Sequence, residues 1–181
     1  SLTNTTNAPV TVTFTFTPTA NACTGSTTSA TVVVNPTPNA VATPSSQTIC
    51  SANNITTIAL TGNVSGTTYS WTRDNTVDVT GISSSGSGNI SGVLVNNTFS
   101  PATVTFTITP TANGCPGSSI TATVLVNPSP VALSSSPSQT ICSGATITNI
   151  NFSSTTSGTT YSWTRNNTVN VTGIAASGTG N

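Results

Sequence analysis

The sequence predicts an all-β fold in which antiparallel β-sandwich modules of about seven strands each follow one another in tandem. The chain overlays itself without a gap at an offset of 92 residues, so that Cys50 falls on Cys142 and Trp71 falls on Trp163. Apolar residues alternate with Thr or Ser along many short segments, and no segment has the period of a helix. Self-similarity of this kind is typical of stacked structural units, and alternation is typical of strands with one buried face.

Pairs of prolines mark the joints between the modules, each directly after an apolar run. These prolines are Pro36, Pro38, Pro128 and Pro130. Because proline fixes φ and removes an amide donor, such joints are expected to be short, extended and semi-rigid. We therefore expect residues 36–127 to form one complete module, residues 1–35 to be the C-terminal part of a preceding module, and residues 128–181 to be the N-terminal part of the following one.

The strands of the complete module are expected where β-branched or aromatic residues alternate with Thr or Ser. The clearest is 103–109, and residues 11–17 repeat it in the preceding module. The other expected strands are 55–60, 67–73, 76–80, 90–95 and 120–126, with one or two short strands before Cys50. Residues 81–89 are rich in Gly and Ser and are expected to form a flexible surface loop. This succession of strands and turns indicates an antiparallel sandwich of immunoglobulin-like type.

Two aromatic residues of each module lie two positions apart in one expected strand. They are Tyr69 and Trp71 in the complete module, and Tyr161 and Trp163 in the following one. Such residues leave the same face of a sheet, and a Trp in the third strand is a common core anchor of these sandwiches. We therefore predict that the rings pack in the core. An exposed pair would instead form a sugar-binding platform, and the solvent exposure of the rings distinguishes the two readings.

Charged side chains are nearly absent from the chain. They are Arg73, Asp74, Asp78 and Arg165, and the net charge is zero, whereas about one quarter of the residues of a typical soluble domain are charged. A chain without net charge tends to associate in solution, which suits a tethered surface polymer better than a crowded cytoplasm. Arg73 and Arg165 occupy equivalent positions and are predicted to bind loop carbonyls at a strand end.

The same composition excludes most site chemistry. Asp74 and Asp78 become Asn166 and Asn170 one module later, and the chain has no His, Lys or Glu. No calcium or zinc site, no cofactor and no catalytic residue is therefore expected, because carboxylate ligands do not recur and an ordinary general base is missing. A basic face for nucleic acid is also lacking. No apolar run approaches the roughly 20 residues of a membrane helix, so an anchor and an export signal are expected outside this sequence.

Each module contributes two cysteines, and such pairs in an otherwise unreactive chain fit an oxidising exterior. The disulfide candidates are Cys23, Cys50, Cys115 and Cys142. One pairing joins Cys50 to Cys115 within a module. In an immunoglobulin-like path, however, these turns lie at opposite ends of the sandwich, whereas a disulfide needs Cα atoms within about 7 Å. The other pairing joins a cysteine of one module to a cysteine of the next, and the sequence leaves both pairings open.

Four segments of the chain carry a family resemblance. They are Ser-Gln-Thr-Ile-Cys at 46–50, Thr-Thr-Tyr-Ser-Trp-Thr at 67–72, Val-Thr-Gly at 79–81 and Thr-Val-Thr-Phe-Thr-Ile-Thr-Pro-Thr-Ala-Asn-Gly-Cys at 103–115. Over essentially its whole length the chain resembles the PKD-like repeats of very large Bacteroidota surface proteins. This resemblance implies a secreted, outer-membrane-attached adhesin, of which the mobile gliding-motility adhesin is the best-known example. It implies no catalytic residue.

These observations together predict a structural role in the shaft of a long extracellular adhesin filament. The expected partners are neighbouring modules of the same chain, surface polysaccharide and other filaments, and many weak contacts would sum to firm attachment. A second hypothesis is that each module binds polysaccharide through exposed Tyr69 and Trp71. A third is ice binding by rows of threonines such as Thr13, Thr15 and Thr17, which requires several such rows aligned on a flat surface.

We predict that the stability of the protein is nearly independent of pH between about 4 and 9, because almost no group in the chain changes its ionisation between the folded and unfolded states in that range. Added salt is expected to have little effect, since few charges are present to be screened. Thermal unfolding measured across this range is the test. A shift of the melting temperature by more than about 10 °C contradicts the prediction.

Overall fold

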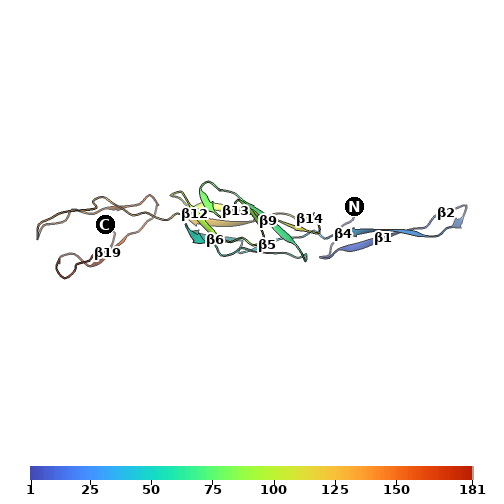
Figure 1. Ribbon diagram of the computed structural model, residues 1–181, viewed down its shortest axis with the longest axis horizontal. Coiled ribbons are helices and arrows are strands. Elements are labelled where there is room, and N and C mark those ends of the chain that lie inside the picture. Colours follow the sequence, from blue (N-terminus) through green and yellow to red (C-terminus); the bar gives the residue numbers. More distant parts are fainter. Residues whose placement is uncertain (181) are drawn as a thin grey trace.

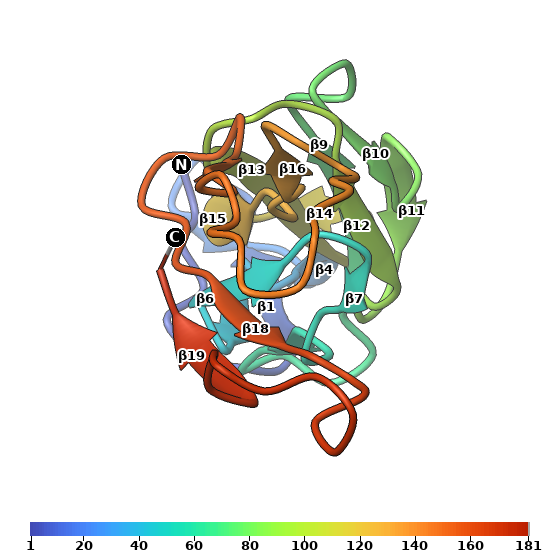
Figure 2. The same ribbon diagram turned by 90° about the vertical axis from the view of Figure 1, so that its left-hand side faces the viewer.

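The computed structural model describes residues 1–180, which form β-strands and loops only. The molecule is elongated, with a central β-sandwich between a long hairpin at one end and a more open segment at the other (Figure 1). Figure 2 looks along the long axis and shows these parts one behind another. We refer to them as the N-terminal segment (1–35), the central module (36–127) and the C-terminal segment (128–180). Within residues 1–180 no helix is long and apolar enough to cross a membrane.

The larger sheet of the central module is built around its two longest strands. Its strands in spatial order are β11 (Ser85–Ser87), β9 (Thr68–Arg73), β13 (Ala102–Ala112), β15 (Ile120–Asn127) and β6 (Ser46–Cys50), and β14 (Cys115–Pro116) pairs with the end of β13. All neighbours are antiparallel except β15 and β6, which run parallel. The parallel edge is possible because β6 comes from the start of the module and β15 from its end.

The second layer consists of short strands. They are β10 (Val79–Gly81), β12 (Val93–Asn96) and β7 (Asn53–Asn54) in one sheet, and β5 (Val41–Thr43) with β8 (Ala59–Thr61) in another. A single bridge between Ile58 and Ile90 lies outside the named strands. The all-β sandwich of immunoglobulin-like type predicted from the alternation of residues is therefore confirmed, and its strands are antiparallel except for the edge pair β6 and β15.

The core lies between the two layers and contains the inward-facing half of each alternating strand. On β13, Val104, Phe106 and Ile108 are fully buried, while the threonines between them face outward. The opposite layer supplies Ile58, Ile90 and Leu94, also fully buried. Phe106 contacts Trp71 edge to face, with ring centroids 5.7 Å apart and an interplanar angle of 79°, a favoured arrangement of aromatic rings. The two rings are the largest side chains among the buried residues of the core.

Some expected elements are shorter than the sequence pattern indicated. Of the expected strand 55–60, only the end forms β8, and of 76–80 only Val79 and Thr80 enter β10. Asn75 has a left-handed φ of 47° and its carbonyl accepts a hydrogen bond from the amide of Val79. A turn therefore occupies the residues before Val79, although they are β-branched or polar like those of a strand.

The expectation that residues 81–89 form a flexible loop is wrong for part of that range. Residues Ser85–Ser87 form β11, which pairs antiparallel with β9 and brings Gly86 opposite Trp71. A Cβ atom on Gly86 would overlap the indole ring. The position of β11 therefore depends on Gly86, which leaves room for the indole ring of Trp71. Alternation of apolar and polar residues does not reveal a contact of this kind.

The two outer segments repeat the strands of the central module. The hairpin of β1 (Val10–Phe16) and β4 (Thr28–Val34), with β2 (Thr19–Ala20) and β3 (Cys23–Thr24) at its tip, lies 92 residues before β13, β14 and β15. The C-terminal segment contains β16 (Leu133–Ser134), β17 (Phe152–Ser153), β18 (Ser162–Thr164) and β19 (Ser177–Thr179), which lie 92 residues after β5, β8, β9 and β11. Phe14 is 42% exposed, whereas its counterpart Phe106 is fully buried. The hairpin thus exposes an apolar face, whereas the equivalent face of β13 and β15 in the central module is buried by the second layer of strands.

Replacing Gly86 by Ala is expected to destabilise the central module by about 2 kcal/mol, because the added methyl group must displace the indole of Trp71 or push β11 away from β9. Urea denaturation of the variant and the parent chain measures the difference. The matched control is Ser85→Ala on the same strand, where an exposed hydroxyl is lost and little change is expected. An unaltered midpoint for Gly86→Ala would show that the ring does not rest on this glycine.

Candidate functional site

The aromatic pair of the central module faces the interior. Trp71 is 8% exposed, and its Nε1 donates a hydrogen bond to the carbonyl of Gly88 at 3.1 Å. Tyr69 is half-buried against the core, and this burial raises the pKa of its phenol above the ordinary value. In the C-terminal segment Tyr161 and Trp163 are half-buried too. A ring as covered as Trp71 cannot stack on a sugar, so the exposure favours core packing over a sugar-binding platform.

A buried cation lies at the end of the strand that carries this pair. Arg73 is only 9% exposed, and its Nε donates to the carbonyl of Ile82 at 2.7 Å, with Ser83 at 3.2 Å. Its Nη1 donates to the carbonyl of Val79 at 3.0 Å. Burial lowers the pKa of the guanidinium below its ordinary value, and the carboxylate of Asp74 opposes this effect. The fork geometry of arginine lets one side chain bind carbonyls of both β10 and the loop that follows it.

The same cage recurs one module later. Arg165 donates from Nε to the carbonyls of Ile174 (3.0 Å) and Ala175 (2.9 Å), and from Nη1 to Val171 (2.8 Å). These acceptors lie 92 residues after those of Arg73. The prediction that both arginines bind loop carbonyls is therefore confirmed. The cage ties a loop to the sheet through Nε and Nη1 of the arginine, which gives the side chain a structural role.

The central module carries its two cysteines at opposite ends. Cys50 is paired in register with Asn127 at the last residue of β15, whereas Cys115 precedes the first residue of that strand. With a rise of about 3.3 Å per residue, the length of β15 separates them by more than 20 Å. A disulfide between these two residues is incompatible with this register. None of the four cysteines is paired in the structure: Cys115 is half-buried and the others are exposed.

The end of the module that carries Cys115 meets the N-terminal segment through specific contacts. The side chain of Asn35 donates from Nδ2 to the carbonyl of Asn113 at 3.1 Å. The side chain of Asn63 donates to Oδ1 of Asn7 at 2.9 Å. Two polar side chains therefore cross the joint, and the modules are in contact there and not merely tethered.

The proline linkers are part of these contacts. Pro36 and Pro38 are buried, and Pro38 lies so close to Gly117 that a Cβ atom at that glycine would overlap the proline carbonyl. In the second linker Pro128 is buried and Pro130 is exposed. A linker seated on the module beside it restricts the angle between neighbouring units.

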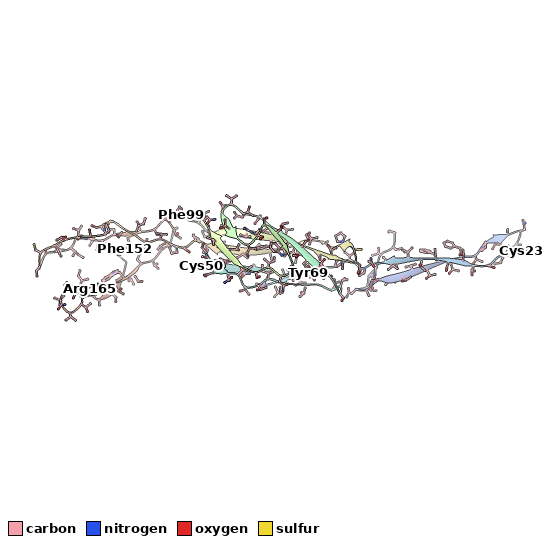
Figure 3. The ribbon with its side chains drawn as sticks, in the orientation of Figure 1. Cys23, Cys50, Tyr69, Phe99, Phe152 and Arg165 are labelled. Carbon is pink, nitrogen blue, oxygen red and sulfur yellow. The ribbon has the colours of Figure 1, made fainter. Side chains whose placement is uncertain are left out.

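The second joint differs from the first in one pair of residues. The counterparts of Asn7 and Asn63 are Phe99 and Thr155, so the polar pair of the first joint is not repeated. Phe99 is 62% exposed at the end of the central module that faces the C-terminal segment, where Figure 3 also shows Cys50. The two joints thus share the terminal asparagine and the linker prolines and differ in this polar pair.

A polar network at this end of the module was missed by the sequence analysis. The buried Asn96 donates from its side-chain Nδ2 to the carbonyl of Val126 at 2.8 Å. Its backbone N–H donates to Oγ of the buried Ser51 at 2.9 Å. The network links β12 to β15 across the two layers. Its signal in the sequence is the repetition of Asn-x-Thr at an offset of 92 residues: Asn4 makes the corresponding bond to the carbonyl of Val34 at 2.7 Å.

The outer face of the larger sheet is covered with hydroxyl groups in rows across the strands. Thr107 of β13 lies in register with Thr72 of β9 on one side and with Thr121 of β15 on the other. Thr109 lies opposite Ser70 in the next row. The face offers many hydrogen-bonding groups. Among residues 1–180, no group of three or more His, Cys, Asp or Glu side chains is placed to hold a metal ion.

One known domain family matches the central part of the chain. Residues 47–130 match the PKD-like domain family. PKD-like domains have an immunoglobulin-like β-sandwich fold, are typically extracellular and are typically non-catalytic. No curated protein matches the chain. The resemblance seen in the motifs is thereby confirmed for this region at the level of the domain type.

Replacing Arg73 by Met is expected to destabilise the central module by about 3 kcal/mol, because the carbonyls of Ile82 and Val79 lose their donor while remaining buried. Arg73→Lys, which keeps the charge but not the planar fork, is expected to cost less. Urea denaturation gives both values, with Thr72→Ala on the outer face as the control. A loss for Arg73→Met no larger than that of the control would mean that the cage contributes nothing to stability.

Proposed function

We propose that the chain is part of the shaft of a long extracellular filament and that its modules act as rigid spacers. The observation that carries this proposal is the first joint, where a buried proline linker and two side-chain hydrogen bonds hold consecutive units end to end. In this proposal residues 1–35 end one module, 36–127 form the next and 128–181 begin a third. The apolar face of Phe14 is then covered by the earlier strands of its own module.

The surface of the shaft agrees with an extracellular setting. A chain with four charged side chains and no net charge has little electrostatic repulsion to keep it dispersed in a concentrated solution, whereas modules held in a filament are spaced by their joints. We propose that the filament is an adhesin at the cell surface, attached to the outer membrane through other parts of the protein and used in surface attachment or gliding. In this proposal residues 1–181 do not bind nucleic acid and do not insert into a membrane.

Adhesion in this proposal comes from repetition. The hydroxyl rows of the outer sheet face form weak contacts with surface polysaccharide or with neighbouring filaments, and many modules make these contacts together. A binding site based on Trp71 is not needed, since that ring is buried. Ice binding by the same threonine rows remains the less favoured hypothesis.

An array of these modules is expected to be a stiff rod with an axial repeat of roughly 35 to 45 Å, because strands of up to about eleven residues rise 3.3 Å per residue and joints of one type impose similar rotations. Electron microscopy of a protein with several modules measures the spacing and the bending. Randomly bent beads without a constant spacing would overturn the shaft proposal and leave the chain as a flexible tether.

A further inference from the structure

We propose that a disulfide joins each module to the next, between Cys50 of one module and the counterpart of Cys115 in the module that follows it. The inference rests on the tandem arrangement of the proposed function, but not on what the filament binds. It explains why each module has two cysteines that cannot reach each other, one at each end.

The first step is the position of Cys50. It is the last residue of β6 and the register partner of Asn127 in the parallel pair with β15. The next residue holds it there: the amide of Ser51 donates to the carbonyl of Asn127 at 2.8 Å, and its hydroxyl accepts from the amide of Asn96. The thiol of Cys50 is exposed at the end of the module that faces the C-terminal segment. Adjacent strands lie about 4.8 Å apart, so Cys50 and Asn127 are direct neighbours.

The second step is the environment of Cys115 at the opposite end. Asn35, which lies 92 residues before Asn127, donates from its side chain to the carbonyl of Asn113 at 3.1 Å. The Sγ atom of Cys115 lies 3.9 Å from that same carbonyl oxygen. Asn113 and Gly114 have left-handed φ values of 50° and 77°, typical of the two-residue hairpin turn that joins β13 to β14. The thiol is therefore fixed beside the joint.

The third step combines the two ends through the repeat. Within a module, the cysteine equivalent to Cys50 lies beside the asparagine equivalent to Asn127. That asparagine binds the turn next to the counterpart of Cys115 in the following module, as Asn35 does here. Both thiols then flank one asparagine side chain at one joint. The counterpart of Cys50 that would meet Cys115 precedes Ser1 in the repeat, so within residues 1–180 neither thiol has its partner, in agreement with the unpaired cysteines.

The chemistry is an ordinary thiol oxidation. One thiolate attacks a disulfide oxidant and forms a mixed disulfide, and the second thiolate displaces the remaining thiol of the oxidant. The S–S bond forms as two protons and two electrons leave the cysteines, and the oxidant is reduced to two thiols. The module thereby gains a covalent bond to each neighbour, and tension along the filament bypasses the proline linker.

The test uses the chain lengthened after Asn181 by a copy of residues 90–127, which continues the repeat in phase and supplies the missing partner. After oxidation by glutathione disulfide, peptide mapping without reduction is expected to find one disulfide, between Cys50 and the added copy of Cys115. Cys23, Cys115 and Cys142 are expected to remain thiols, and the parent chain is expected to form no intrachain disulfide. Cys50→Ser abolishes the bond, whereas the matched control Cys142→Ser leaves it intact.

Three outcomes overturn the inference: a disulfide between Cys50 and Cys115 of the same module, no disulfide in the lengthened chain, or a bond that survives Cys50→Ser. Electron microscopy of the same protein separates this failure from that of the proposed function. A stiff rod with constant spacing but free thiols would reject only the disulfide proposal. Flexibly linked beads would reject the proposal that the modules form a rigid shaft.

Discussion

The parallel pairing of β6 with β15 is the constraint on which the rest of the module depends. It joins the first long strand to the last, so that the chain enters at one end of the sandwich and leaves at the other. The register of this pair sets Cys50 beside Asn127 and places Cys115 a full strand length away. An antiparallel edge would return the chain to the end at which it entered. The linear arrangement of modules therefore follows from one strand pair.

Because charged side chains are nearly absent, the central module depends on one buried cation, Arg73, to hold a loop against its sheet. A buried guanidinium is costly unless its donors are satisfied, and backbone carbonyls can do this without a carboxylate partner. Arg73 binds the loop between β10 and β11, and the same strand carries Trp71, which rests on Gly86 of β11. The cation and the ring thus hold one edge of the sandwich together. Because Arg165 repeats the contact while Asp74 and Asp78 become asparagine, the carbonyl cage does not depend on acidic neighbours.

The fold was largely predictable from the sequence because long strands carry a periodic signal. β13 and β15 were located by alternation, and Trp71 was assigned to the core by its place in the third strand. β11 could not be found in this way, because its residues are Gly and Ser and its position depends on a ring from another strand. The contacts at the joint could not be predicted from the alternation of residues either, because bonds such as Asn63 to Asn7 connect residues far apart in sequence. Only the three-dimensional path brings them together.

The contrast between the two joints bears on how closely similar modules avoid pairing with the wrong neighbour. Exchange of strands between similar repeats is a characteristic failure of tandem proteins. The first joint uses Asn7 and Asn63, whereas the second has Phe99 and Thr155 at the same positions. A module that lost its place would set Phe99 against Asn63 and lose the exposed hydrogen bond between Asn63 and Asn7, a bond of a kind that contributes about 1 kcal/mol at most. The strands, the terminal asparagine and the linker prolines recur while this one pair of joint residues changes, so the pair is what distinguishes one neighbour from another.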